Sequence, residues 1–236
     1  MMIGLGRFLF RYRNGLFPVA YLLLFWGGRQ IFENDWLAAG CGLGVALVGQ
    51  VLRAITIGLA YIIRGGRNRQ AYADALVTEG MFAHCRNPLY LGNLLILAGL
   101  GLASNSLVFL VVVVPLFVLA YVAIIAAEED YLRQKFGQQF DDYCARVNRL
   151  IPNCAGLGQT LRGMEFHWQR LAVKEYGSAF AWMAGMILVV AKNLWLHGGF
   201  AQQRAMIVSL GILLGAVTLG YGILRYLKKS RALQAD

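Results

Sequence analysis

The chain contains few charged residues for its length. Only 14% of its 236 residues are Asp, Glu, Lys or Arg, whereas 58% are hydrophobic. Because a soluble domain is usually about 25% charged, this composition argues against a soluble enzyme and indicates a protein whose main solvent is lipid. The length allows one compact domain.

Cysteine is also scarce, and the common catalytic signatures are missing. The four cysteines, Cys41, Cys85, Cys144 and Cys154, form no CxxC pair and have no His at a zinc-ligand spacing. We therefore expect neither structural disulfides nor a metal site. The absence of a Walker motif, of HExxH, of GxSxG and of a strand-based GxGxxG argues against P-loop hydrolases, zinc peptidases and α/β-hydrolases.

Apolar stretches long enough to cross a bilayer recur along the chain. A helix that spans the hydrocarbon core needs about 20 predominantly apolar residues. Six stretches qualify, two of them loosely: residues 16–32, 36–63, 89–103, 107–127, 177–196 and 205–226. We therefore expect an all-α, polytopic membrane bundle of about six transmembrane helices.

The distribution of basic residues gives this bundle an orientation. The net charge is +10, from 22 Lys and Arg against 12 Asp and Glu. If the N-terminus lies in the cytoplasm, most of the basic residues fall on the cytoplasmic side, as the positive-inside rule requires. We predict an integral protein of the bacterial inner membrane with both termini cytoplasmic, and we assign the basic excess to topology and anionic headgroups rather than to nucleic acid.

Two segments between the spans, residues 64–88 and 128–176, are predicted to be cytoplasmic. The second opens with apolar residues at spacings of three and four, which predict an amphipathic helix that Pro152 ends. These residues are Leu132, Phe136, Phe140, Tyr143, Val147 and Leu150. We divide the chain into a membrane core, residues 1–152, and a cytoplasmic linker with a C-terminal two-helix membrane hairpin, residues 153–236.

Polar residues gather at the entrance to the third predicted span. His84, Arg86 and Tyr90 surround Pro88, which suits the first turn of a helix because that position needs no N–H. The open N–H groups of such a turn favour an anion, and Arg86 could add a bidentate clamp. The other interpretation is that Arg86 and Tyr90 only anchor the span at the membrane interface.

Two further clusters allow both a structural and a ligand-binding interpretation. Gly99 and Gly101 form a GxG in the third span, but small residues in a span usually let helices approach closely. Glu128, Glu129 and Asp130 stand at the cytoplasmic end of the fourth span, where the helix dipole prefers cations. Their compensating charge is either Arg and Lys of the loops or a cationic ligand such as a sulfonium.

Arg53 lies within the second predicted span. A charge at membrane depth is costly, so an ionisable residue there is a functional hypothesis by default. The structural explanations are an ion pair, or a side chain that extends toward the inner interface.

Taken in order, these segments resemble the isoprenylcysteine carboxyl methyltransferase and phospholipid methyltransferase family of integral-membrane enzymes. Residues 76–82 and 86–92 read LVTEGMF and RNPLYLG, similar to the family pattern LVTxGxY…RHPxYxG. The GxG at residues 99–101 is similar to that of the phospholipid enzymes, and EEDYLRQKFGQQFDDYCARVNRLIP at residues 128–152 resembles EExxLxxxFGxxYxxYxxxVxRxIP. The resemblance covers residues 72–152. Within it, Asn87 replaces the His of RHP, and Phe82 stands where Tyr is common.

The resemblance implies a helical membrane core that binds S-adenosylmethionine on its cytosolic side. It also implies a lipid or lipid-linked small-molecule substrate that enters from the bilayer, such as an isoprenylcysteine-like carboxylate or a phospholipid amine. Arg86 and Glu129 become the candidates for catalysis or substrate orientation. The candidates for cofactor binding are His84, Tyr90, Gly99, Gly101, Glu128 and Glu129. The oligomeric state stays open.

The methyl acceptor also stays open. A carboxylate acceptor needs no base at neutral pH and could be oriented by Arg86, whereas an amine acceptor would need Glu128 or Glu129 to remove a proton. Two other classes compete: an NADPH-dependent reductase similar to steroid 5α-reductases, which share a related C-terminal pattern, and a non-enzymatic membrane scaffold. The double acid followed by Leu and Phe-Gly favours the methyltransferase.

Overall fold

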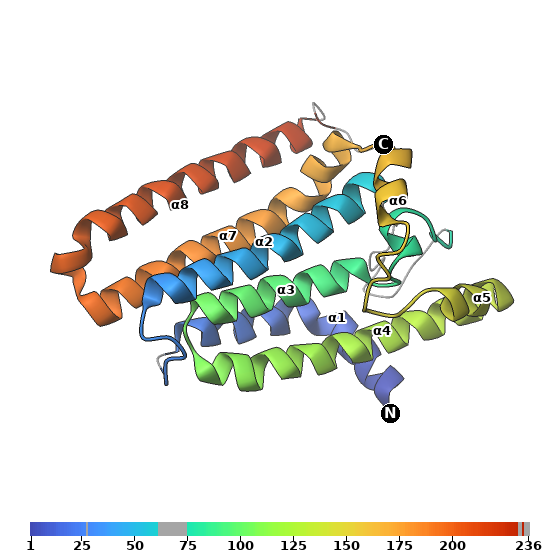
Figure 1. Cartoon of the computed structure of the whole chain (residues 1–236), viewed down its shortest axis with the longest axis horizontal. Coiled ribbons are helices and arrows are strands. Elements are labelled where there is room, and N and C mark those ends of the chain that lie inside the picture. Colours follow the sequence, from blue (N-terminus) through green and yellow to red (C-terminus); the bar gives the residue numbers. More distant parts are fainter. Residues whose placement is uncertain (27, 61–74, 231–232, 234–236) are drawn as a thin grey trace.

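A computed structural model of the chain describes residues 1–26, 28–60, 75–230 and 233, and within them all regular structure is helical (Figure 1). The α-helices are α1 Met2–Tyr21, α2 Asp35–Leu59, α3 Pro88–Ala103, α4 Val114–Phe136, α5 Gln138–Arg146, α6 Leu157–Gly163, α7 Trp168–Gly198 and α8 Phe200–Lys229. Short 3₁₀ segments are η1 Leu22–Phe25 and η2 Gly80–Ala83, and a π-helical turn, η3 Phe109–Val113, leads into α4. The expected all-α fold is confirmed.

The long helices lie roughly side by side in one bundle (Figure 1). α1 packs on α4, α2 packs on α3 and α7, and α8 packs on α7. The contact between α2 and α3 is close because glycines meet there: a Cβ on Gly99 would lie 2.5 Å from the carbonyl oxygen of Gly42 and 2.6 Å from the amide nitrogen of Ala46. Small residues that let backbones approach are a common way of joining membrane helices.

Four helical stretches are long and apolar enough to cross a membrane: Asp35–Leu59, Phe109–Phe136, Trp168–Gly198 and Phe200–Lys229. They agree with four of the predicted spans, although residues 61–63 of the second lie outside the described residues. The predicted span at residues 89–103 is the shorter apolar helix α3, and Pro88 occupies its first turn as expected. The count of six spans stays a prediction.

The first predicted span had the wrong boundaries. Residues 16–32 do not form one helix, because α1 begins at Met2 and ends at Tyr21, and only η1 follows it. The chain after η1 is fixed by Asn105 between α3 and η3, whose side-chain oxygen accepts from the backbone N–H of Ile31 and Phe32. These turn contacts replace helical hydrogen bonds and explain why the apolar run is not one continuous helix.

The prediction of a single amphipathic helix over residues 132–150 was also wrong. α4 continues through the acidic cluster to Phe136, and Gly137 separates it from α5 with φ +51° and ψ −126°, a conformation that favours glycine. The apolar periodicity was nevertheless informative, because Leu132, Phe140 and Tyr143 form a small buried core. α5 therefore folds back on the end of α4 and does not extend it.

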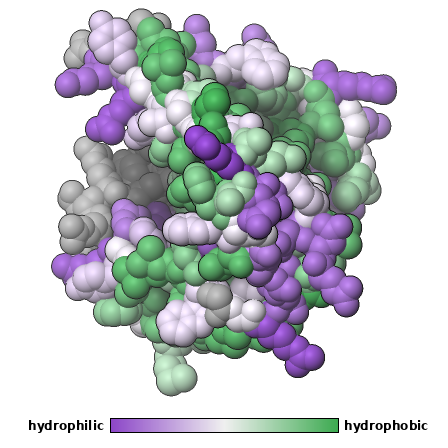
Figure 2. Space-filling model, turned by 90° about the vertical axis from the view of Figure 1, so that its left-hand side faces the viewer, coloured by the Kyte–Doolittle hydropathy of each residue, from purple (hydrophilic) through white to green (hydrophobic). Residues whose placement is uncertain are grey.

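The two ends of the bundle carry different parts of the chain. α1 begins and α8 ends toward the end that carries α5 and α6 (Figure 1). At the opposite end, where α7 joins α8, hydrophilic side chains stand among apolar ones (Figure 2). α8 lies at one edge of the bundle, and no residue of α8 is buried.

Candidate active site

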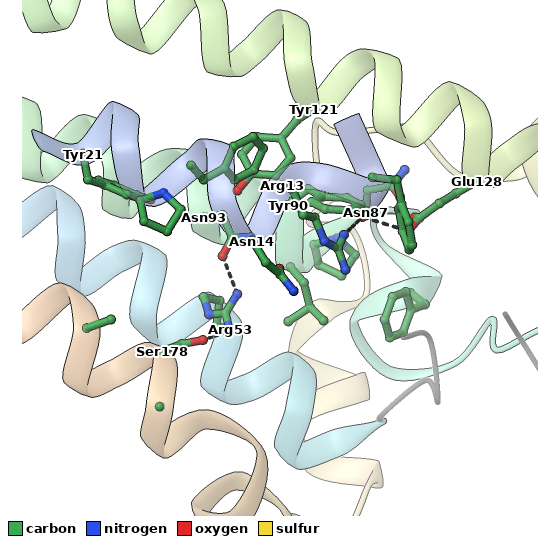
Figure 3. A pocket seen from close by; sticks show the side chains of 18 residues that line it. Arg13, Asn14, Tyr21, Arg53, Asn87, Tyr90, Asn93, Tyr121, Glu128 and Ser178 are labelled. Carbon is green, nitrogen blue, oxygen red and sulfur yellow. Dashed lines mark hydrogen bonds between the residues drawn. The ribbon is translucent and has the colours of Figure 1, made fainter. Parts of the chain in front are cut away.

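A cavity of 630 Å³ lies among α1, α2, α3, α4 and α7 (Figure 3). Its size is within the range of small-molecule sites, about 300–1,000 Å³. The side chains that line it are Phe10, Arg13, Asn14, Phe17, Pro18, Tyr21, Arg53, Phe82, Asn87, Pro88, Leu89, Tyr90, Asn93, Tyr121, Glu128, Gly177, Ser178 and Ala181. It is therefore an aromatic cavity with a few polar groups.

A short chain of hydrogen bonds marks one end of the cavity. The Tyr90 hydroxyl donates to Glu128 Oε1 at 2.8 Å and accepts from Arg13 Nη1 at 3.3 Å. Glu128 is buried, and among the described residues its Oε2 has no hydrogen-bond partner. A buried carboxylate oxygen without a donor is unusual in a native fold. This atom is thus suited to meet a donor or a cation of a ligand.

A buried ion pair lies further along the cavity. Arg53 Nε and Nη2 donate to the two carboxylate oxygens of Glu175 at 2.7 and 2.6 Å. Arg53 also donates to Asn93 and Ser178, which joins α2, α3 and α7 (Figure 3). The structural ion pair considered for Arg53 is present, and Arg53 lines the cavity as well. Its charge is compensated, so this part of the cavity is polar without a net charge.

Glu129 points away from the cavity that Glu128 faces. Successive residues of a helix are turned by about 100°, so the two carboxylates meet different partners. Glu129 Oε1 accepts from Arg86 Nε at 3.2 Å, and its Oε2 accepts from Arg149 Nη2 at 2.5 Å. Arg86 Nη1 also donates to the carbonyls of Cys144 and Val147 at 3.0 and 2.7 Å. Arg86 and Glu129 thus hold α5 and the segment after it against α3 and α4.

His84 also contacts protein groups outside the cavity. Its ring nitrogens lie 2.7 Å from the Asn153 carbonyl oxygen and 2.8 Å from Thr160 Oγ1. The neighbouring Cys85 is fully buried, and burial raises the pKa of its thiol. Asn87, where the family pattern has His, lines the cavity while its amide donates to the Arg149 carbonyl at 3.1 Å.

The GxG residues lie in helix contacts rather than in the cavity. Gly99 is packed against α2, and a Cβ on Gly101 would lie 2.8 Å from the ring of Phe109. Neither is among the residues that line the cavity. Of the sequence-predicted candidates, the structure brings Tyr90 and Glu128 together in the cavity and places His84, Arg86, Glu129, Gly99 and Gly101 outside it.

Comparisons with known proteins identify the family. The phospholipid methyltransferase family model matches residues 38–139. The nickel-cobalt-cadmium resistance protein NccN of Alcaligenes xylosoxydans xylosoxydans is 30% identical over 152 residues, 63% of this chain and 68% of that protein. The cobalt-zinc-cadmium resistance protein CzcN of Cupriavidus metallidurans is 31% identical over 160 residues, again 63% and 68%. Protein-S-isoprenylcysteine O-methyltransferase B of Arabidopsis thaliana is 30% identical over 145 residues, 57% and 67%.

The chain belongs to the isoprenylcysteine carboxyl methyltransferase and phospholipid methyltransferase family. The resemblance read from its motifs is therefore confirmed, and the reductase class is not favoured. No solved structure matches the chain. The family segment at residues 38–139 contributes Arg53, Tyr90 and Glu128 to the cavity, whereas α1 and α7 lie outside that segment.

Sequence reasoning missed the contribution of α1 to this cavity. Phe10, Arg13, Phe17 and Tyr21 line it. They recur at spacings of three and four, the pattern of one helix face. Arg13 is one of the basic residues whose distribution orients the bundle, and this periodicity is the signal that could have assigned it to the site as well. Ser178 and Asn93 carried no such signal, because neither belongs to a polar run.

The groups around the cavity suit the methyltransferase cofactor S-adenosylmethionine. Its sulfonium is an organic cation, and cations bind well over aromatic faces and beside carboxylates. Tyr90, Tyr121 and Phe10 supply aromatic rings, and the Oε2 atom of Glu128 supplies an acceptor that has no hydrogen-bond partner among the described residues. Arg13 stands at the same end as a donor for an anionic group. The residues present thus fit a molecule that carries both charges.

Proposed function

We propose that the protein is an S-adenosylmethionine-dependent methyltransferase that acts on a lipid or lipid-linked substrate at the cytoplasmic face of the membrane, with its cofactor in the cavity beside Glu128. One observation carries the proposal: a buried carboxylate with an unpartnered oxygen faces an aromatic cavity in a member of a membrane methyltransferase family. The bacterial inner membrane and the cytoplasmic position of both termini belong to this proposal.

The protein's contribution to methyl transfer is to align donor and acceptor and to exclude water. Bound S-adenosylmethionine supplies an activated methyl group on a positively charged sulfur. Glu128 offsets that positive charge, and Tyr90 holds Glu128 in place through its 2.8 Å hydrogen bond. The aromatic side chains keep water away from the reacting atoms.

The side chains around the cavity can assist methyl transfer to either a carboxylate or an amine acceptor. With a carboxylate acceptor no base is needed, and Arg13 orients the anion at the cavity end that it shares with Tyr90. With an amine acceptor Glu128 receives the proton, directly or through water. Arg86 and Glu129 then act as positioning residues, because their contacts fix the segment that closes this end of the bundle.

The printed names of two bacterial relatives refer to metal resistance. Among the described residues, no group of three or more His, Cys, Asp or Glu could hold a metal ion. The proposed reaction gives a metal no role, and it fits the methyltransferase name of the plant relative.

Calorimetric titration of the detergent-purified protein with S-adenosylmethionine and, separately, with NADPH tests the proposal. We expect S-adenosylmethionine to bind and NADPH not to bind. Glu128→Ala removes the carboxylate in the cavity and should abolish binding. Asp130→Ala is the matched control, because Asp130 is an acid of the same helix that pairs with exposed Arg7. Binding of NADPH alone, or equal binding by Glu128→Ala and the wild type, would refute the proposed site.

A further inference from the structure

The cavity is long and has two chemically different ends. The lining residues of α1 run from Phe10 to Tyr21, which corresponds to about 16 Å along a helix axis. Arg13, Tyr90 and Glu128 stand at one end and Tyr21 at the other (Figure 3). The first end carries the charged groups of Arg13 and Glu128, and the Glu128 oxygen that has no hydrogen-bond partner among the described residues. The other end holds no net charge, because Glu175 compensates Arg53, and Phe17, Pro18 and Ala181 add apolar surface to its lining.

The uncharged end is bounded by two helices that flank the opening. α1 packs mainly on α4, and α7 packs on α2, α8 and α3. Both contribute exposed side chains to the lining, Pro18 and Ala181, while Arg53 beneath them is buried. The cavity thus opens sideways between α1 and α7, and α7 as a whole is long and apolar enough to cross a membrane.

Small residues of α7 leave this opening wide. Gly177 lines the cavity, and a Cβ built on it would meet no atom within 4 Å. One turn further along lies Ala181, and between them Ser178 accepts from Arg53 Nη2 at 3.2 Å. The Arg53–Glu175 pair fixes the rotation of α7 about its axis. As a result Gly177 and Ala181, rather than larger side chains of α7, face the cavity.

We infer that Gly177, Ser178 and Ala181 of α7, positioned by Arg53 and Glu175, form the wall that receives the uncharged hydrocarbon part of an amphiphilic methyl acceptor and determines which acceptors fit. This inference rests on the proposed function. The acceptor's reactive group then lies at the end with Tyr90 and Glu128, and its chain extends past Ser178 toward the bilayer. α7 and α1 lie outside the segment that the family model matches.

The test fills the space without disturbing the protein. Gly177→Leu places a side chain where the cavity is open, and Gly177→Ala fills a smaller part of the same space. Gly211→Leu in α8 is the matched control, because Gly211 is exposed, does not line the cavity and also has no atom within 4 Å of an added Cβ. The wild type and the three variants are purified in detergent, and their thermal unfolding shows that each is folded.

The probe is a long-chain fatty acid that carries a photoreactive diazirine in its chain. After illumination, peptide mass spectrometry compares labelling of the cavity walls on α1 and α7 with labelling of α8. We expect Gly177→Leu to reduce wall labelling about tenfold, or about 1.4 kcal/mol of binding. Gly177→Ala should reduce it less, and Gly211→Leu should leave it unchanged.

S-adenosylmethionine binding by the same proteins separates the two proposals. Unchanged cofactor binding in Gly177→Leu together with lost wall labelling supports the inference. Wall labelling equal in Gly177→Leu and Gly211→Leu, or labelling confined to α8, overturns it even if the cofactor binds. Absence of cofactor binding in the wild-type protein overturns the proposed function instead.

Discussion

Removal of either partner of the Arg53–Glu175 pair should weaken the fold strongly. Both residues are buried, with relative exposures of 8% and 3%, and two hydrogen bonds of 2.7 and 2.6 Å join their side chains. Loss of one partner leaves a buried charge uncompensated, which costs about 3–5 kcal/mol. For Glu175→Leu the cost falls on Arg53, which among the described residues retains only Asn93 and Ser178 as acceptors. For Arg53→Met it falls on Glu175, which in the described part of the chain retains only Gln50 as a donor.

The double variant Arg53→Met/Glu175→Leu should lose much less stability than the sum of the two single variants. Apolar residues of similar size often replace a buried ion pair at little cost, because neither charge then needs desolvation. We therefore expect a coupling free energy of at least about 2 kcal/mol, since contacting residues couple by about 0.5–3 kcal/mol. The measurement is the free energy of unfolding of all four proteins in mixed micelles, titrated with denaturing detergent. Losses that add within about 0.5 kcal/mol would show that the pair does not act as a unit, and would refute this reasoning.

Three further changes test other parts of the structure. Glu128→Gln keeps the shape of the side chain but removes its charge, so calorimetry should show that the affinity for S-adenosylmethionine falls by about tenfold to a hundredfold. Unchanged affinity would show that the carboxylate has no part in cofactor binding. Gly99→Leu should reduce the free energy of unfolding by at least about 3 kcal/mol, because an added Cβ would lie within 2.6 Å of the α2 backbone; a fully stable variant would contradict the described packing. A thiol reagent applied at pH 7 to the native protein should modify exposed Cys154 and spare Cys85, whose thiol is buried with a raised pKa; mass spectrometry of peptides reads both sites, and equal labelling would contradict the burial of Cys85.

The positions of the apolar helices could be predicted from the sequence because burial in lipid leaves a continuous apolar run. α3, α7 and α8 were found in this way, and Pro88 marked the first turn of α3. The break at Gly137 was missed because the apolar periodicity continues across it, and only the backbone angles show that the chain turns there. The start of α1 was missed because its three Arg residues interrupt the apolar run, so that the first half of the helix reads as a polar segment before a span.

The candidate site was predicted in part. The ordered motifs identified the family and placed Tyr90 and Glu128, which meet in the cavity. The motifs could not separate Glu128 from Glu129, because adjacent acids read alike until the rotation of the helix is known. Arg53 was recognised as unusual, but its partner Glu175 is 122 residues away in the chain, and no local pattern connects them.

The division of the cavity wall has a consequence for how relatives of this protein can diverge. Tyr90 and Glu128 come from the stretch that the family model matches, whereas the walls on α1 and α7 come from stretches on either side of it. Inherited changes in α1 and α7 can therefore alter the shape offered to an acceptor without touching Tyr90 or Glu128. Under the proposed function, two lineages can thus keep one chemistry while they take different methyl acceptors, and similarity over the shared stretch alone does not reveal a common substrate.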